Sequence, residues 1–429
     1  MAVCKTQNIM KAYIKTYGCT LNQADGDLMA SILESNGVEI VDSIGDSDVV
    51  VLNTCTVKKP TEQRTLHVLK KLSDAGKRMV VAGCMVGSRD DAIERCAPGA
   101  SLVNTSNVHH VYDAVSAAYS SGRALFDGRG RTDKLAFFSQ TGGVIARIPI
   151  NDGCISSCAF CETKHARGRL NSFSEELILK AVERSVRGGA KEIQITSQDA
   201  GAYGVDRNTD VAELMEKISK IDGDFKVRVG MLNPEHLDRC FDRFADAMLD
   251  SKFYKFVHLP VQSGSNRVLS HMGRRYTAEE FIERVRAIRQ RIPEASIETD
   301  VIVGYPVESL SDFDATIDMI KEAKPDVTNI SKFCARPHAR AARLKAINNK
   351  EVSRRSMVLS RLVRSVQNDI NRRMVGMSVK ALMTEITGRS VNGRSQSYKQ
   401  VVIPGRGACV GDYVVTKIDA ASANAIYGS

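Results

Sequence analysis

The chain has 429 residues, enough for two or three domains, and its 43% of hydrophobic residues is typical of a globular protein. No apolar run approaches a membrane span and the N-terminus lacks the order of a signal peptide, so we expect a cytoplasmic protein without a membrane partner. Eleven cysteines in such a protein indicate metal or redox chemistry and not disulfides.

The positive charge is concentrated at the C-terminus. Eighteen Lys and Arg stand against five Asp and Glu from Ser331 to Ser429, a net charge of +13, whereas the first 330 residues carry −3. A basic block of this kind predicts contact with a polyanion, most simply a nucleic-acid backbone. The alternative is a solvated surface that only aids solubility.

The first hundred residues alternate between short apolar runs and helical periodicity. We expect strands at 12–17, 48–52 and 79–82, a helix at 21–36 and a second helix from Pro60 onward. Strands that alternate with helices predict a doubly wound parallel sheet.

Each of these three strands runs into a cysteine. The segments are Tyr17-Gly18-Cys19, Asn53-Thr54-Cys55 and Gly83-Cys84. Because parallel α/β sheets place ligands at the carboxyl ends of their strands, we expect these strand-end cysteines (Cys19, Cys55 and Cys84) to meet at one rim. The alternative is that all three are small buried hydrophobic residues.

The middle of the chain repeats a strand–helix rhythm. Expected strands are 144–150, 192–196, 226–230, 255–259, 296–303 and 327–333, and expected helices include 174–187, 235–249, 277–289 and 311–321. Six such units predict a partial (β/α)6 barrel, whose sites lie at the C-terminal ends of its strands. Polar stretches near three strand ends are candidates for cofactor or substrate contacts, or simply for loop capping: Ser197-Gln198-Asp199, Gln262-Ser263-Gly264 and Glu298-Thr299-Asp300.

A second cysteine set follows the first strand of this barrel. The loop cysteines, Cys154, Cys158 and Cys161, have the spacing C-x-x-x-C-x-x-C with no nearby fourth ligand. Structural zinc favours four ligands. A four-iron cluster held by three thiolates has one open iron that can bind a substrate. An incomplete zinc knuckle remains the alternative.

The end of the chain combines a basic helical stretch, 354–373, with short β-like runs at 379–384, 401–403 and 413–418. Glycines punctuate these runs, which predicts a small all-β barrel of about fifty residues. Small basic barrels commonly hold RNA. The residues expected to contact phosphates there are Arg389, Arg394, Lys399 and Arg406.

Together, the two cysteine sets resemble those of the radical S-adenosylmethionine (radical SAM) methylthiotransferases. The segments Leu259 to Ser265 and Asp300 to Pro306 are also similar to that family. The resemblance implies an N-terminal methylthiotransferase domain at 10–120, a radical SAM core at 140–370 and a C-terminal TRAM barrel at 371–429 that binds RNA.

The resemblance also implies cofactors. Two 4Fe-4S clusters are expected, one on each cysteine set, and two S-adenosylmethionine molecules, one as methyl donor and one as source of a 5′-deoxyadenosyl radical. The cofactor-binding residues would be Phe160, whose backbone is expected near the adenine, together with Gln198, Gln262 and Asp300. Implied partners are tRNA, a flavodoxin- or ferredoxin-like electron donor and an unidentified sulfur donor, and the enzyme is expected to be a monomer.

The subgroup can be argued from two segments. Thr16 to Asp27 and Cys161 to Gly168 resemble the archaeal and eukaryotic branch, which methylthiolates C2 of N6-threonylcarbamoyladenosine beside the tRNA anticodon. The branches that modify isopentenyladenosine or a ribosomal protein usually have Glu-Gly-Cys where this chain has Asp152-Gly153-Cys154. Both activities remain alternatives, as does a zinc-dependent RNA-binding protein.

The other cysteines are interpreted as structural: Cys4, Cys96, Cys240, Cys334 and Cys409. Of these, Cys334 departs from the Tyr or Ser that is expected at its position in the family.

Overall fold

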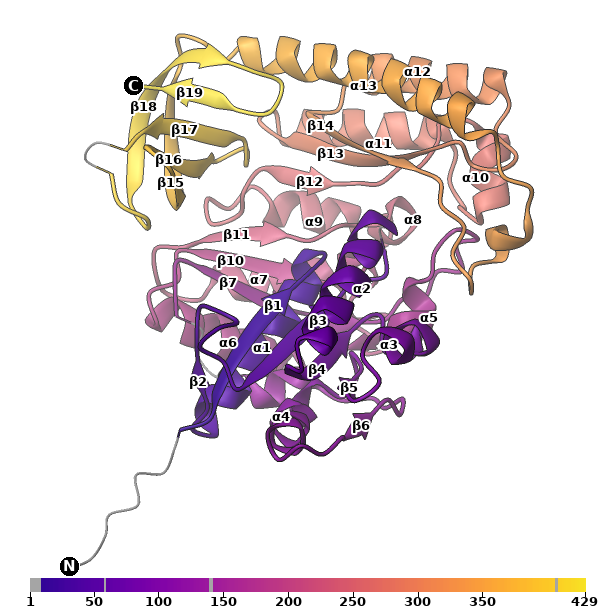
Figure 1. The fold of residues 1–429 in the computed structure, drawn as a ribbon. Helices are drawn as coiled ribbons and strands as arrows, with labels where there is room; N and C mark the ends of the chain where they lie inside the picture. Colours follow the sequence, from indigo (N-terminus) through magenta and orange to yellow (C-terminus); the bar gives the residue numbers. More distant parts are fainter. Residues whose placement is uncertain (1–8, 58, 139–141, 406–407) are drawn as a thin grey trace, which may run out of the picture. The chain divides into compact units, whose positions relative to one another are not determined.

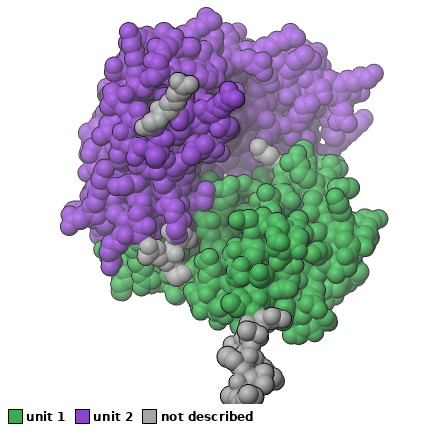
Figure 2. All heavy atoms as spheres, turned by 60° about the vertical axis from the view of Figure 1, so that its left-hand side comes forward, with its two compact units in different colours: residues 1–141, 151–154, 162–184 green, residues 142–150, 155–161, 185–429 purple. Residues whose placement is uncertain are grey.

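The computed structural model describes residues 9–57, 59–138, 142–405 and 408–429. The chain forms two compact units, which Figure 2 draws in separate colours. Unit 1 comprises residues 1–141, 151–154 and 162–184, and unit 2 comprises residues 142–150, 155–161 and 185–429. Cys4 and Arg406 lie outside the described residues.

Unit 1 is built on a six-stranded parallel sheet with the order β2-β1-β3-β4-β5-β6 (Figure 1). Its strands are β1 (Lys11–Thr16), β2 (Glu39–Ile40), β3 (Val49–Thr54), β4 (Arg78–Gly83), β5 (Ser101–Val103) and β6 (Leu125–Phe126). A short antiparallel pair, β8 (Asn151–Asp152) and β9 (Asn171–Ser172), also belongs to this unit. The predicted parallel sheet is confirmed.

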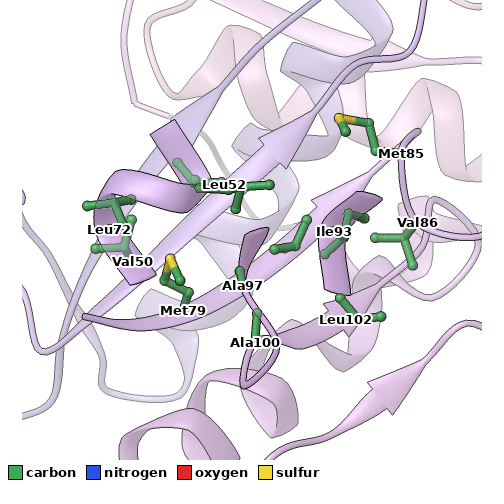
Figure 3. Packing of buried hydrophobic residues seen from close by; sticks show 12 residues of the cluster. Val50, Leu52, Leu72, Met79, Met85, Val86, Ile93, Ala97, Ala100 and Leu102 are labelled. Carbon is green, nitrogen blue, oxygen red and sulfur yellow. The ribbon is translucent and has the colours of Figure 1, made fainter. Parts of the chain in front are cut away.

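Helices cover both faces of the sheet, which explains why β3 is buried along its whole length. The helices are α1 (Thr20–Ser35), α2 (Lys59–Asp74), α3 (Asp90–Cys96), α4 (Val111–Tyr119), α5 (Thr163–Arg167) and α6 (Glu175–Arg187), the last of which continues into unit 2. Figure 3 shows the core beneath α2 and α3, where Val50, Leu52 and Met79 pack with Leu72 and Ile93. Alternate strand residues face α1 and α4.

Unit 2 contains the predicted partial barrel of six parallel strands. These are β7 (Ile145–Pro149), β10 (Glu192–Thr196), β11 (Lys226–Val229), β12 (Phe256–His258), β13 (Ser296–Val303) and β14 (Val327–Lys332). They form two parallel triplets, β7-β10-β11 and β12-β13-β14, that a parallel bridge between Val227 and Phe253 connects. The outer helices are α7 (Val211–Ser219), α8 (Pro234–Leu237), α9 (Phe241–Ala247), α10 (Asn266–Met272), α11 (Ala278–Arg291), α12 (Leu310–Ala323) and α13 (Asn349–Arg372).

One predicted helix of the barrel is wrong in its extent. The sequence favours a single helix at 235–249, but α8 ends at Leu237 and α9 begins at Phe241. Between them the backbone of Cys240 (φ −137°) leaves the helical region. Before the break, in α8, the His236 side chain is held by Asp199. Tertiary contacts of α8 therefore override the continuous helical pattern.

The chain ends in a closed β-barrel with the order β15-β16-β17-β19-β18, as predicted and consistent with a TRAM barrel. Its strands are β15 (Ser378–Thr387), β16 (Ser390–Ser395), β17 (Gln400–Pro404), β18 (Tyr413–Ala421) and β19 (Ile426–Gly428). The sequence misses β16 because it is polar, with only Val391 as a large apolar residue facing the barrel core. None of the helices in the described parts of the chain has the length and apolarity needed to cross a membrane.

Candidate functional site

The strand-end cysteines lie just after the carboxyl ends of β1, β3 and β4, three adjacent strands of unit 1. Backbone hydrogen bonds join their loops: Tyr17 N donates to Asn53 O at 2.9 Å, and Cys84 N donates to Thr54 O at 3.0 Å. The parallel register therefore places the three loops along one rim of the sheet.

The first loop approaches Cys55 so closely that position 18 requires glycine. Gly18 has φ +110°, and a Cβ built on it would lie 2.7 Å from the Cβ and 2.8 Å from the Sγ of Cys55. Any side chain would therefore strain the backbone and displace the thiol of Cys55. This close packing accounts for the glycine that precedes Cys19.

The three thiols differ in their surroundings. Cys55 and Cys84 are buried, whereas Cys19 is exposed and stands immediately before α1, whose N-terminus favours negative charge. Burial raises the pKa of the Cys84 thiol to about 12, with Arg167 acting against this rise and Cys55 and Cys19 adding to it. The thiol is thus neutral at physiological pH unless a metal takes the place of its proton.

Four charged side chains that the sequence analysis did not select lie beside these cysteines. This buried charge cluster consists of Asp25, Lys134, Asp152 and Arg167, each with a side chain no more than 8% exposed. Lys134 Nζ lies 2.9 Å from Asp25 Oδ1 and also pairs with Asp152. Although burial acts to raise it, the pKa of Asp152 is lowered by Lys134 and Arg167. The cluster balances two acids with two bases, as buried charges require.

Arg167 connects this cluster to the strand-end cysteines. Its Nε donates to Cys84 Sγ at 3.3 Å, and its Nη2 donates to Asn22 Oδ1 at 2.9 Å. The sequence gives a weak indication that Asp152 and Arg167 belong to a site, because they stand in the segments on either side of the loop cysteines. Nothing in the spacing alone shows that these segments contact α1 and β4.

The loop cysteines are divided between the two units: Cys154 belongs to unit 1, and Cys158 and Cys161 belong to unit 2. All three are partly buried. In unit 1, Cys154 N donates to Gly168 O at 3.3 Å. In unit 2, Ala159 N donates to Met272 O at 2.8 Å, which fixes the loop between Cys158 and Cys161 against the end of α10.

A cation stands beside the unit 2 part of this loop. The guanidinium of Arg274 lies 5.5 Å from the ring centre of Phe160. Burial raises the pKa of Cys158, and Arg274 acts in the opposite direction. The positive charge of Arg274 would offset negative charge on these cysteines, so Arg274 is a further candidate site residue that was not predicted from the sequence.

The predicted cofactor stretches fall in three places within unit 2. Gln198 is half-buried after β10, next to Asp199, which contacts His236 Nδ1 at 2.5 Å. Burial acts to lower the pKa of His236, but hydrogen bonds to Asp199 and Glu235 raise it to about 9. A cavity of about 460 Å³ is lined by Ser156, Ser157, Glu235, His236, Arg274 and Arg340, among other residues.

Gln262 and Asp300 lie on neighbouring segments. Gln262 N donates to Asp300 O at 2.8 Å, and Gln262 adopts a φ of +76°, a conformation that non-glycine residues rarely take. The carboxylate of Asp300 lies 3.0 Å from His258 Nε2 and accepts a bond of 2.9 Å from Asn329 Nδ2. Asp300 therefore belongs to a polar group on strands β12, β13 and β14 that includes Glu298.

The residues predicted to contact nucleic acid differ in availability. Arg389 is exposed, and Arg394 lies over the ring of Tyr398 at 4.8 Å. Lys399 is only 12% exposed and pairs with Asp326 at 2.7 Å, so its charge is already used within unit 2. Arg361 and Arg364, which were not among the residues predicted to contact nucleic acid, line an open groove of about 660 Å³ between α13 and residues 421–423.

This architecture defines the class of the protein. Residues 148–320 match the Radical SAM superfamily, and residues 11–104 match the uncharacterized protein family UPF0004. Among solved structures, the radical S-adenosylmethionine methyltransferase TsrM of Kitasatospora setae is similar with a TM-score of 0.58 at 15% identity, covering 78% of this chain and 77% of that one. The chain is thus a radical SAM enzyme, which implies S-adenosylmethionine and one 4Fe-4S cluster.

Curated relatives identify the family. The chain is 40% identical over 426 residues to a probable threonylcarbamoyladenosine tRNA methylthiotransferase of Archaeoglobus fulgidus, covering 98% of each chain. It is 38% identical over 401 residues to the Pyrococcus horikoshii protein of the same name, covering 92% of this chain and 94% of that one. The chain belongs to the threonylcarbamoyladenosine tRNA methylthiotransferase family. This result rules out the non-enzymatic zinc protein considered from the sequence.

Proposed function

We propose that this enzyme transfers a methylthio group to C2 of N6-threonylcarbamoyladenosine next to the tRNA anticodon. It would use two S-adenosylmethionine molecules and two 4Fe-4S clusters. The observation that carries the proposal is the second cysteine set: three thiols on adjacent parallel strands of unit 1, in addition to the loop cysteines of a radical SAM enzyme. Relatives named for the same substrate favour it over isopentenyladenosine or a ribosomal protein.

The chemistry explains why cofactors are needed. The C2–H bond of an adenine is neither acidic nor electrophilic, so acid–base side chains cannot activate it, whereas the radical SAM cofactor supplies the required radical chemistry. In this proposal the protein holds one cluster with the loop cysteines and offsets their charge with Arg274. Phe160, Gln198, Gln262 and Asp300 stay our candidates for contacts with S-adenosylmethionine.

The strand-end cysteines fit the second cluster, here named the auxiliary centre. The three thiols from three loops would be the ligands of an iron–sulfur cluster with one open iron. Support comes from the glycine that lets one loop approach Cys55 and from the buried cation beside Cys84. The open position would carry the sulfur that is transferred. We take the sulfur donor to be a separate partner, and the reductant to be a flavodoxin- or ferredoxin-like protein.

The C-terminal part of unit 2 would hold the tRNA. Exposed arginines of the barrel and of α13 supply the positive charge, and Arg389, Arg361 and Arg364 are the ones we select. Lys399 is better explained as an anchor within unit 2. Arg394 stays a candidate because its guanidinium can stack on Tyr398 and still reach a phosphate.

Anaerobic reconstitution followed by nucleoside analysis of treated tRNA tests the proposal. We expect about eight irons per chain from two four-iron sites. We also expect methylthiolated threonylcarbamoyladenosine as the product. The triple variant Cys154→Ala, Cys158→Ala, Cys161→Ala should keep about half of the iron and form no product. Four irons in the unaltered chain, or product only on isopentenyladenosine or ribosomal protein, would refute it.

A further inference from the structure

The guanidinium of Arg167 is held from every side inside unit 1. Its Nη1 donates to Asp152 Oδ1 at 3.1 Å, and its Nη2 contacts Asp25 Oδ2 at 2.8 Å and Asn22 Oδ1 at 2.9 Å. Its Nε donates to Cys84 Sγ at 3.3 Å. With a side chain only 1% exposed, Arg167 has a single orientation, and that orientation directs an N–H group at a cysteine.

The charges around Arg167 indicate that the carboxylates need only part of its guanidinium, which leaves an N–H group for the sulfur of Cys84. Asp25 and Asp152 are already balanced by Lys134 and Arg167 together. A structural ion pair would need only the two Nη groups, which the carboxylates and Asn22 occupy. The Nε donor is left for Cys84, a buried cysteine and the strand-end cysteine whose Sγ the charge cluster contacts.

We propose that Arg167 is a positioning residue of the auxiliary centre. The Nε–H group of Arg167 donates to the Cys84 thiolate and so raises the reduction potential of the cluster bound there. The inference rests on the proposed function, because it requires a cluster on the strand-end cysteines. Reduction adds negative charge to the cluster and its sulfur ligands, so a fixed donor at a ligand sulfur stabilises the reduced state. Residues that orient metal ligands in this way typically affect metal retention as well.

Arg167 also stands close in the sequence to the loop cysteines. Asp152 stands two residues before Cys154, and Arg167 stands six residues after Cys161. The buried charge cluster therefore contains one residue from each side of the segment that carries the loop cysteines. The residue that tunes the auxiliary centre is therefore part of the segment that carries the loop cysteines. A change at Arg167 acts first on Cys84, because that is the ligand it contacts.

The test reads the auxiliary centre alone. In the full chain with Cys154→Ala, Cys158→Ala and Cys161→Ala, the centre is reconstituted anaerobically with iron and sulfide, and its midpoint potential is measured by a redox titration followed by electron paramagnetic resonance. Arg167→Lys keeps the positive charge and removes the Nε donor. We expect a more negative potential and about tenfold weaker retention of iron against a chelator. Arg169→Lys, an exposed arginine two residues away, should change neither.

The outcomes separate this inference from the proposed function. If the background chain binds no iron before Arg167 is changed, the auxiliary centre itself is refuted. If Arg167→Lys binds iron with an unchanged potential, the role of Arg167 is refuted while the centre stands. Where Arg167→Lys fails to fold by circular dichroism, Arg167→Gln combined with Asp25→Asn removes the Nε donor and keeps the cluster balanced with one acid, Asp152, and one base, Lys134. A lowered potential then supports the inference, and an unchanged one overturns it.

Discussion

The hydroxyl of Tyr398 donates to Glu192 Oε1 at 2.9 Å and so ties the turn between β16 and β17 to the first residue of β10. The Tyr398 ring packs against Tyr254 and Phe256, with ring centres 4.8 Å and 4.9 Å apart. The neighbouring Lys399 pairs with Asp326. The C-terminal barrel is therefore anchored to the amino-terminal ends of the radical SAM strands, opposite the end where their site loops lie.

Removal of this anchor should destabilise unit 2. We expect Tyr398→Phe to lower the free energy of unfolding by about 1.5 kcal/mol, because the bond to a buried carboxylate is lost. Tyr398→Ala should cost about 3 kcal/mol through the lost ring packing. Urea denaturation followed by circular dichroism measures both. The exposed Tyr427 on β19 offers a control, since Tyr427→Phe should change stability by less than about 0.5 kcal/mol. Equal effects at both positions would contradict the anchor.

The buried charge cluster predicts that loss of Lys134 strongly destabilises the protein and that a second substitution restores part of the stability. Lys134→Met leaves Asp25 and Asp152 with one cation between them, and removal of one partner from a buried ion network typically costs about 3 to 5 kcal/mol. Adding Asp25→Asn removes one unbalanced charge and should restore part of the loss. Thermal and urea unfolding report both variants. As a control, Lys180→Met breaks an exposed pair with Glu176 and should have little effect. A double variant no more stable than Lys134→Met would argue against the charge balance.

The His236 contact predicts a pH-dependent contribution to stability. Its pKa is raised from 6.5 to about 9, so the protonated form favours the folded state. That contribution is complete below about pH 6.5 and is lost as the pH rises through about 9. The stability of the unaltered protein should therefore fall more steeply over this range than that of His236→Gln, when the unfolding midpoint is followed by urea denaturation from pH 6 to pH 9.5. Parallel curves for the two proteins would show that Asp199 and Glu235 do not hold a protonated imidazole.

The groove beside α13 predicts how tRNA binding depends on salt. Arg361→Gln with Arg364→Gln removes two cations that line the groove, which should weaken binding and reduce the salt slope by about two. Arg354→Gln is the matched control on the same helix, because Arg354 already pairs with Glu351 at 2.8 Å. Filter binding at several salt concentrations measures both effects. If the control and the double variant lose affinity equally, the groove is not the binding surface.

The strands, helices and cysteine sets could be read from the sequence because their signals are local. Strand β10 and strand β13 match the predicted bounds, since a run such as Glu192–Thr196 is short, alternates isoleucine with polar residues and is flanked by loops. The rim of strand-end cysteines also follows from local order, because parallel strands with similar connections end on the same side. The charge excess after Ser331 needed only counting.

The partners of individual charged side chains were decided by the tertiary structure. Lys134 and Asp25 are 109 residues apart, and Arg167 and Asn22 are 145 apart, yet each pair is buried and in contact. Lys399 looked available for RNA until the fold placed it against Asp326. A pattern in the sequence shows which residues can carry charge or bind metal, but a buried charge is tolerated only where the fold supplies its partner. Neither Arg167 beside Cys84 nor the break between α8 and α9 could therefore be read before the chain was folded.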